Sequence, residues 1–158
     1  MDVAYTAVGR AIIAAQTLET ALVPILELHR VHSEPDRLSK TGGYLSVGAF
    51  KVPVSSMVKL LAERGSIAPD LESRLSAYVE DRHLLVHRWI QVHGIPESNA
   101  DFIALSKHAL RAAQEAHDLT QILVRYVLKY AEPGWAAANL EEYKARMAKL
   151  FQTAHADD

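Results

Sequence analysis

The feature that most constrains the fold is a run of small and apolar residues between positions 101 and 130, which recur at alternating three- and four-residue steps. This spacing is a heptad-like seam along one face of a long α-helix. The members of the seam are Phe102, Leu105, Ala109, Ala112, Ala116, Leu119, Leu123, Tyr126 and Tyr130. The central alanines should let a second helix approach closely. A helix with such a seam has to bury it against other helices, so the pattern predicts a helical bundle.

Four more segments show helical periodicity, and none shows the period-two alternation of a half-buried strand. We therefore predict an all-α fold, an antiparallel bundle of four to five helices. In the first helix the inward face is expected to include Val8, Ile12 and Leu22, and Pro24 is expected to kink it. The 158 residues fit a single domain, 1–158, with a frayed C-terminal tail. The expected segments are helices at 3–30, 53–64, 69–93, 101–130 and 135–151, and a loop at 31–52.

Composition narrows the possible partners and compartments. The net charge of −2 gives no global basic field, so any nucleic acid would have to meet a local positive potential. The chain has no cysteine, which excludes disulfides, thiol nucleophiles and cysteine-ligated zinc and fits a reducing cytoplasm. No signal peptide is visible, and no apolar run approaches the length of a membrane span. We expect a cytoplasmic protein without a membrane partner.

One charged residue interrupts the apolar face of the helix expected at 69–93. On a helical wheel Arg82 falls near the middle of the stripe that Leu71, Leu75, Tyr78, Leu85, Val86 and Trp89 form. A charge in that position is costly unless it is paired. Arg82 is therefore expected either to have an acidic partner or to face a pocket or interface that holds an anion. Glu19 is the candidate partner, because it falls within the apolar stripe of the first helix.

His87 lies five residues after Arg82, which in a regular α-helix is about 140° round the axis and roughly 7.5 Å along it. The two side chains would then not share a face. They can act together only if the helix is distorted, or if the site lies in a groove that both flanks reach. A groove between two copies of the domain would bring two arginines and two histidines together.

The sequence Arg82-His83-Leu84-Leu85-Val86-His87 resembles the Arg-x4-His motif of HEPN domains, which are helical bundles. His83 stands where many members of that family have a polar residue after the arginine. Glu80 is similar to the acidic residue often found just before it. The helical layout is also similar over most of the chain, with the motif late in a central helix and a long helix after it.

The resemblance implies a metal-independent endoribonuclease, often a toxin or phage-defence effector, that acts as a homodimer on RNA. The ribose 2′-OH would be the nucleophile. His87 would move the proton as general acid or base, and Arg82 would hold the scissile phosphate. His83 would be a helper residue, and the scheme needs no cofactor or metal.

Other interpretations remain open. The chain could be a non-catalytic helical module that binds a nucleotide or a partner protein, such as a nucleotidyltransferase antitoxin. His83 and His87, four residues apart, could bind zinc if a third ligand were present. We expect Tyr78 and Trp89 to be core residues, and Arg74 and Arg88 to lie on the polar side of their helix. The other histidines, His108 among them, are expected at the surface.

Overall fold

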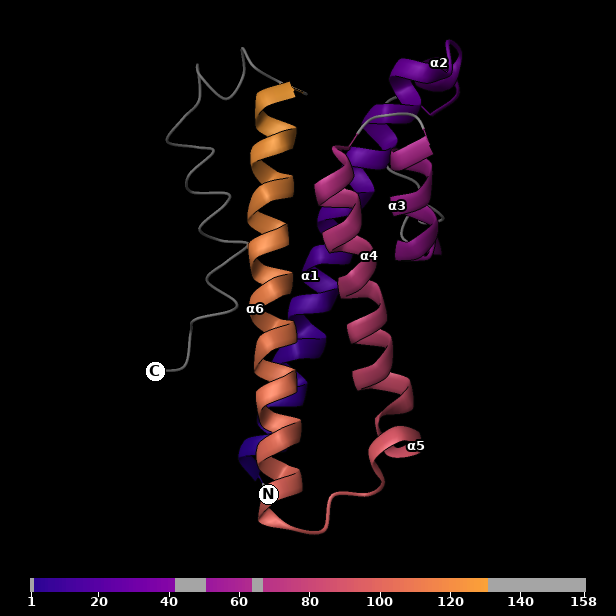
Figure 1. Ribbon diagram of the computed structural model, residues 1–158. Helices are drawn as coiled ribbons and strands as arrows, with labels where there is room; N and C mark the ends of the chain where they lie inside the picture. Colours follow the sequence, from indigo (N-terminus) through magenta and orange to yellow (C-terminus); the bar gives the residue numbers. More distant parts are fainter. Residues whose placement is uncertain (1, 42–50, 64–66, 131–158) are drawn as a thin grey trace.

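The computed structural model describes residues 2–41, 51–63 and 67–130, and every regular element within these ranges is helical. The all-α helical bundle that the sequence predicts is confirmed (Figure 1). The helix expected at 135–151 and the expected frayed tail lie outside the described residues. The elements are α1 (Asp2–Ser33), α2 (Arg37–Thr41), α3 (Val54–Glu63), α4 (Pro69–His83), the π-helical turn η2 (Leu84–Arg88), α5 (Trp89–His93) and α6 (Asn99–Tyr130).

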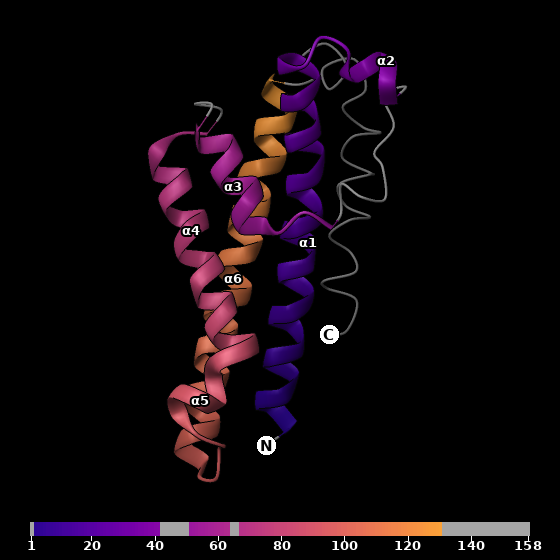
Figure 2. The same cartoon turned by 90° about the vertical axis from the view of Figure 1, so that its right-hand side faces the viewer.

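The two longest helices, α1 and α6, lie side by side and run in the same direction (Figures 1 and 2). Their register is consistent from end to end: Ala4 clusters with Leu105 near the start of both helices, and Leu22 clusters with Leu123 further along. The segment formed by α4, η2 and α5 runs in the opposite direction beside them. The expected antiparallel packing therefore holds for this segment, whereas α1 and α6 pack in parallel.

Alanines form the part of the α1–α6 contact near the N-terminal ends of the two helices. Four of them on α1, Ala4, Ala7, Ala11 and Ala15, are at most 4% exposed. Ala109, Ala112 and Ala116 of α6 are at most 3% exposed. The seam predicted for α6 is thus confirmed from Leu105 to Leu123. The inward position expected for Ile12 is wrong, because Ile12 is 37% exposed and alanines take the inner face of α1 there. Small side chains let the helix backbones approach closely.

Two core clusters lie on either side of Arg82. In one cluster, Leu75 and Tyr78 of α4 pack with the leucines of α1, α3 and α6. In the other, Leu85 and Trp89 pack against the alanine half of the α1–α6 contact. Tyr78 and Trp89 are buried, as expected, but Val86 is 37% exposed and does not belong to the inner stripe. Arg82 lies between the residues of this helical segment that belong to the first cluster and those that belong to the second.

Several predicted boundaries need correction. The loop expected at 31–52 is shorter, since α1 continues to Ser33 and α2 occupies part of it. Pro24 lies inside α1, which continues as one element on both sides of it. The last long helix begins at Asn99, two residues early, because Ser98 and Asp101 cap it reciprocally. The Ser98 amide donates to Asp101 Oδ2 over 2.9 Å, and the Asp101 amide donates to Ser98 Oγ over 3.2 Å.

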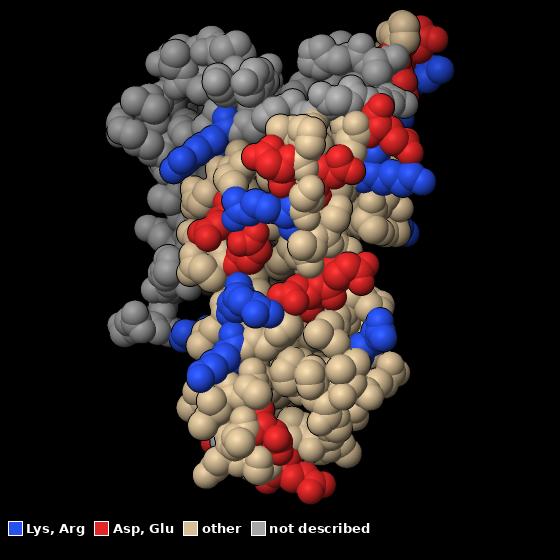
Figure 3. Space-filling view, viewed as in Figure 1, with Lys and Arg blue, Asp and Glu red and all other residues tan. Residues whose placement is uncertain are grey.

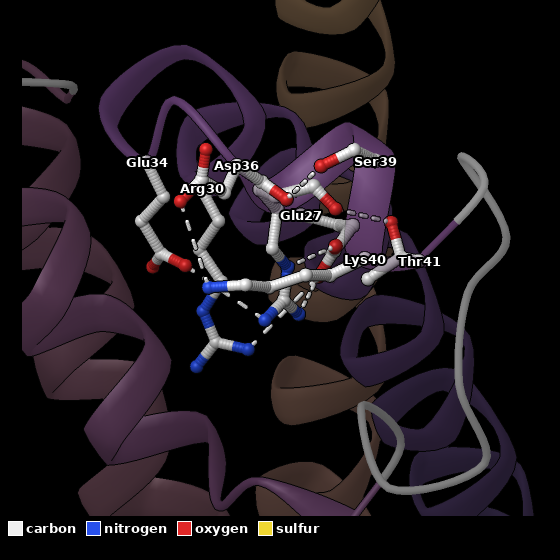
Figure 4. A network of polar contacts seen from close by, with 8 residues as sticks. Glu27, Arg30, Glu34, Asp36, Ser39, Lys40 and Thr41 are labelled. Atoms are coloured by element: carbon white, nitrogen blue, oxygen red, sulfur yellow. Dashed lines mark hydrogen bonds and ion pairs between the residues drawn. The ribbon is translucent and has the colours of Figure 1, made fainter.

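A buried ion pair attaches α2 to α1 (Figure 4). Glu27 is 8% exposed, and Arg37 donates to its two carboxylate oxygens over 2.7 and 2.8 Å. Arg30, one turn after Glu27, adds a longer ion pair of 4.0 Å. The Arg37 hydrogen bonds hold the pKa of Glu27 below its usual value of 4.5. This two-point contact explains why a short helix forms within the segment predicted to be a loop.

We expect Glu27→Gln to lower the free energy of unfolding at pH 7 by about 2 kcal/mol, because it removes a charged hydrogen-bonding partner of Arg37. A carboxyl group with a lowered pKa stabilises the fold fully above its unfolded pKa and loses that contribution as pH falls through the folded value. The difference in the free energy of unfolding between wild type and Glu27→Gln, measured by urea unfolding, should therefore become smaller below about pH 4.5. A difference in the free energy of unfolding that stays constant down to pH 3 would contradict the stabilising role of the ionised Glu27 carboxylate.

Residues 2–27 of α1 are long and apolar enough to span a membrane, by length and composition alone, with a mean hydropathy of 1.2, and only 33% of this stretch is buried. The expectation that no apolar run approaches a membrane span thus needs correction for this helix. Core helices of water-soluble proteins and N-terminal signal sequences are equally long and apolar. The buried alanines and leucines of α1 pack in the core, whereas Val3, Tyr5 and Ile13 of the same helix are exposed.

Candidate functional site around Arg82 and His87

The helix that carries the motif is distorted between Arg82 and His87. Regular α-helix ends at His83, η2 covers the next five residues, and α-helix resumes at Trp89. In a π-helical turn the backbone hydrogen bonds join residues five apart, so each residue rotates less round the axis than in an α-helix. The angle between the two motif side chains is therefore smaller than the 140° or so that a regular helix would give. Such turns are frequent at functional sites.

Arg82 pairs with Glu19 of α1, as the sequence suggested. Its terminal nitrogen lies 3.1 Å from Glu19 Oε1, and the two side chains are 34% and 33% exposed. The Nε atom of Arg82 is buried and has no hydrogen-bond partner within the described ranges. The guanidinium thus has donors left over, although one carboxylate already partly neutralises its charge.

Arg82 also lines a pocket of about 340 Å³, which lies between α1, α4 and the chain segment that leads into α3. This volume is at the lower end of the range for small-molecule sites. Lys51 and Arg82 contribute positive charge to the walls, against one carboxylate from Glu19. Tyr78 lines the pocket as well, and burial raises the pKa of its hydroxyl, which therefore stays protonated near neutral pH. The pocket is suited to a small anion.

The two motif histidines lie next to one another. The rings of His83 and His87 are 5.1 Å apart and tilted by 48°. His83 lines the Arg82 pocket, whereas His87 is exposed and lies outside its walls. Among the described residues no third carboxylate or imidazole completes a metal site around them. Two imidazoles alone fall short of the three or four protein ligands that zinc sites use.

The structure does not bring Glu80 to this site. Glu80 is exposed and lines a neighbouring depression of about 190 Å³, together with residues of α3. The similarity of Glu80 to the acidic residue of the HEPN motif therefore has no contact with Arg82 or His87 to support it in the described part of the chain. Of the predicted site residues, Glu19, Arg82 and His83 share one pocket, and His87 adjoins it.

The sequence did not indicate the positions of Lys51 and His108. Lys51 lies three residues before α3 and lines the pocket, and a single lysine there gives no signal in the sequence. His108 was expected at the surface, but its side chain is only 13% exposed and faces the motif helix. Its position four residues before Ala112, next to the buried Ala109, could have indicated burial. Arg74, expected on the polar side, is half-exposed and pairs with Glu115 of α6 over 2.9 and 3.0 Å.

Charge is mixed over the surface that Figure 3 shows, where basic and acidic groups alternate without one continuous basic area. On that face any attraction for a polyanion would have to be local, as the net charge already indicated. Comparison with protein-family models gave no match, and neither did comparison with curated proteins or with solved structures.

Proposed function

We propose that this protein is a HEPN-like, metal-independent endoribonuclease whose site is built from Arg82 and His87. The observation that carries the proposal is the π-helical turn between these two residues, because it reduces the angle that would separate them in a regular helix. The pocket at Arg82, which Lys51 also lines, supports it. A toxin or phage-defence role, an antitoxin partner and a cytoplasmic location belong to the same proposal.

The residues suit cleavage through the ribose 2′-OH. The 2′ oxygen would form a bond to phosphorus as its proton leaves to a general base. The bond from phosphorus to the 5′ oxygen would break, and that oxygen would take a proton from a general acid. An imidazole can serve in either role near neutral pH. Arg82 would hold the non-bridging oxygens and stabilise their growing charge, leaving a 2′,3′-cyclic phosphate and a 5′-hydroxyl.

A second copy of the chain would complete the site. His87 lies outside the walls of the Arg82 pocket in one copy, so a facing copy could supply the second imidazole that the two proton transfers need. Val86 and Ile90, on either side of His87, are 37% and 61% exposed although they are apolar. A second copy that faced this side of η2 would cover both side chains.

The test is RNA cleavage by the purified protein, with and without a chelator. We expect wild type to cleave in both conditions and Arg82→Ala to be inactive. Arg82→Lys should recover little, since an ammonium cannot reproduce the two-point contact of a guanidinium. Arg88→Ala removes an exposed arginine of the same helical segment and is the matched control. Equal cleavage by wild type and Arg82→Ala would refute the proposal.

The Glu19–Arg82 ion pair favours the alternative, a non-catalytic module that binds a nucleotide or a partner such as a nucleotidyltransferase antitoxin. A carboxylate that already contacts Arg82 competes with any phosphate for it. In this alternative the pocket would bind without cleaving.

Glu19→Gln should therefore raise the affinity for a mononucleotide such as 5′-AMP about fivefold, which corresponds to about 1 kcal/mol for a half-exposed ion pair. Calorimetric titration of wild type, Glu19→Gln and Arg82→Ala measures this. Because Glu19→Gln keeps the size of the side chain, an unchanged affinity would mean that Glu19 does not compete with phosphate. Binding that survives in Arg82→Ala would locate the nucleotide elsewhere.

A further inference from the structure

His108 of α6 contacts both ends of the segment that carries the motif. Its Nε2 atom lies 3.7 Å from Asp81 Oδ1, and Asp81 directly precedes Arg82. Its ring lies 5.2 Å from the ring of Trp89, which directly follows η2. One side chain on a neighbouring helix therefore reaches the residues before and after the distorted stretch.

The proton on His108 can be assigned from its partners. A terminal nitrogen of Arg111 lies 3.1 Å from His108 Nδ1, and a guanidinium can only donate. In the neutral ring Nδ1 thus accepts, and the proton is on Nε2, the atom that faces Asp81. Arg111 also lies 3.3 Å from Asp81 Oδ2, so the three side chains form a closed polar group between α4 and α6.

The polar group leaves one buried atom without a hydrogen bond. His108 Nε2 is inaccessible to solvent and has no hydrogen-bond partner within the described ranges, because 3.7 Å to Asp81 is too long for one. A buried donor of this kind destabilises the fold. Since the nearest acceptor is next to Arg82, a small shift of the motif segment toward α6 would satisfy the atom.

At the other end, Trp89 is held between two histidines. Its ring lies 4.3 Å from that of His93, at 36°, and 5.2 Å from that of His108, at 52°. Trp89 is 9% exposed and packs with the alanines of α1 and α6. The residue that directly follows η2 is thus packed against α6, and these contacts place the end of the turn.

We propose that His108 is a positioning residue for the RNA-cleaving site: by contacting Asp81 and Trp89 it sets the relative placement of Arg82 and His87. This inference depends on the proposed function for its effect on cleavage, but its effect on the turn is independent of it. His108 does not line the pocket, and its contacts with Asp81 and Trp89 lie on either side of the motif, so it would act through the backbone of 81–89.

Two measurements test the proposal in His108→Ala. The first is RNA cleavage, where a misplaced site should lower kcat roughly 10- to 100-fold with little change in KM. His108→Phe, which keeps a ring against Trp89, should recover part of kcat, and Asp81→Asn should lower it without a large change in packing. The second is NMR of the backbone amides of η2, which should shift in His108→Ala whether or not the protein cleaves RNA.

Leu119→Ala is the control for lost stability, because it opens a cavity in the same helix but in the other core cluster. It should lower Tm and leave kcat unchanged at temperatures where it is folded. The proposal is overturned if the amide shifts in His108→Ala stay close to residue 108 and the η2 amides do not move. It is also overturned if kcat falls equally in Leu119→Ala. Absence of cleavage by wild type would refute the proposed function, while the NMR result would still decide the role of His108.

Discussion

Replacing His87 with alanine is expected to lower kcat of RNA cleavage by about 10²- to 10⁴-fold, the usual contribution of a general acid or base. KM should change little, because Arg82 and its pocket would still bind the RNA backbone. His87→Gln should be no better, since an amide can form hydrogen bonds but does not exchange a proton near neutral pH. Steady-state kinetics on a fluorescent RNA oligomer, in the presence of a chelator, measures both constants.

Gln91→Ala is the matched control for His87, because Gln91 is exposed one turn further along the same segment. It should cleave as wild type does. If His87→Ala keeps the kcat of wild type while Arg82→Ala loses activity, then His87 takes no part in proton transfer. The site would in that case need another acid or base, for which His83 is the nearest candidate.

The second large effect concerns the close contact between α1 and α6. Ala116 is fully buried, in the core cluster that also holds Ala15 and Leu18 of α1. Ala116→Leu adds three carbons where the two helices meet, so it should force them apart. We expect a loss of about 3 kcal/mol, at the upper end for overpacked cores, and a Tm lower by about 9 °C for a domain of this size. Thermal unfolding followed by circular dichroism measures the change.

Ala104→Leu makes the same substitution on the exposed face of α6 and is expected to change stability by no more than about 0.5 kcal/mol. Equal Tm values for Ala116→Leu and wild type would mean that α1 can move away from α6 without loss. The parallel packing described here would then be looser than the buried alanines indicate.

Much of the fold was readable from the sequence because helix periodicity repeats over long segments. The α6 seam predicted its own buried residues, from Leu105 to Leu123. In α1 the same reasoning failed at Ile12. A helical wheel places the most hydrophobic residues inside, whereas the contact of α1 with α6 needs small side chains. The short helix α2 was missed, since it is held by the tertiary ion pair between Glu27 and Arg37 and not by its own periodicity.

The candidate site was predictable only in part. A charge within an apolar stripe indicated Arg82, and the same argument indicated its partner Glu19. The π-helical turn left no trace in the spacing, because Tyr78, Leu85 and Trp89 keep a regular helical pattern across it. The contacts of His108 with Asp81 and Trp89 join residues about twenty or more positions apart, and such contacts cannot be inferred from one helix at a time.

The most direct test of the central claim is the chemistry of the cleavage products. An RNA oligomer is incubated with wild type in the presence of a chelator, beside an identical oligomer with a 2′-deoxynucleotide at the cleaved position. Attack by the 2′-OH predicts a 2′,3′-cyclic phosphate and a 5′-hydroxyl from the first oligomer and no cut at that position in the second. Cleavage of the 2′-deoxy linkage, or a product with a 5′-phosphate, would contradict the role assigned to Arg82 and His87.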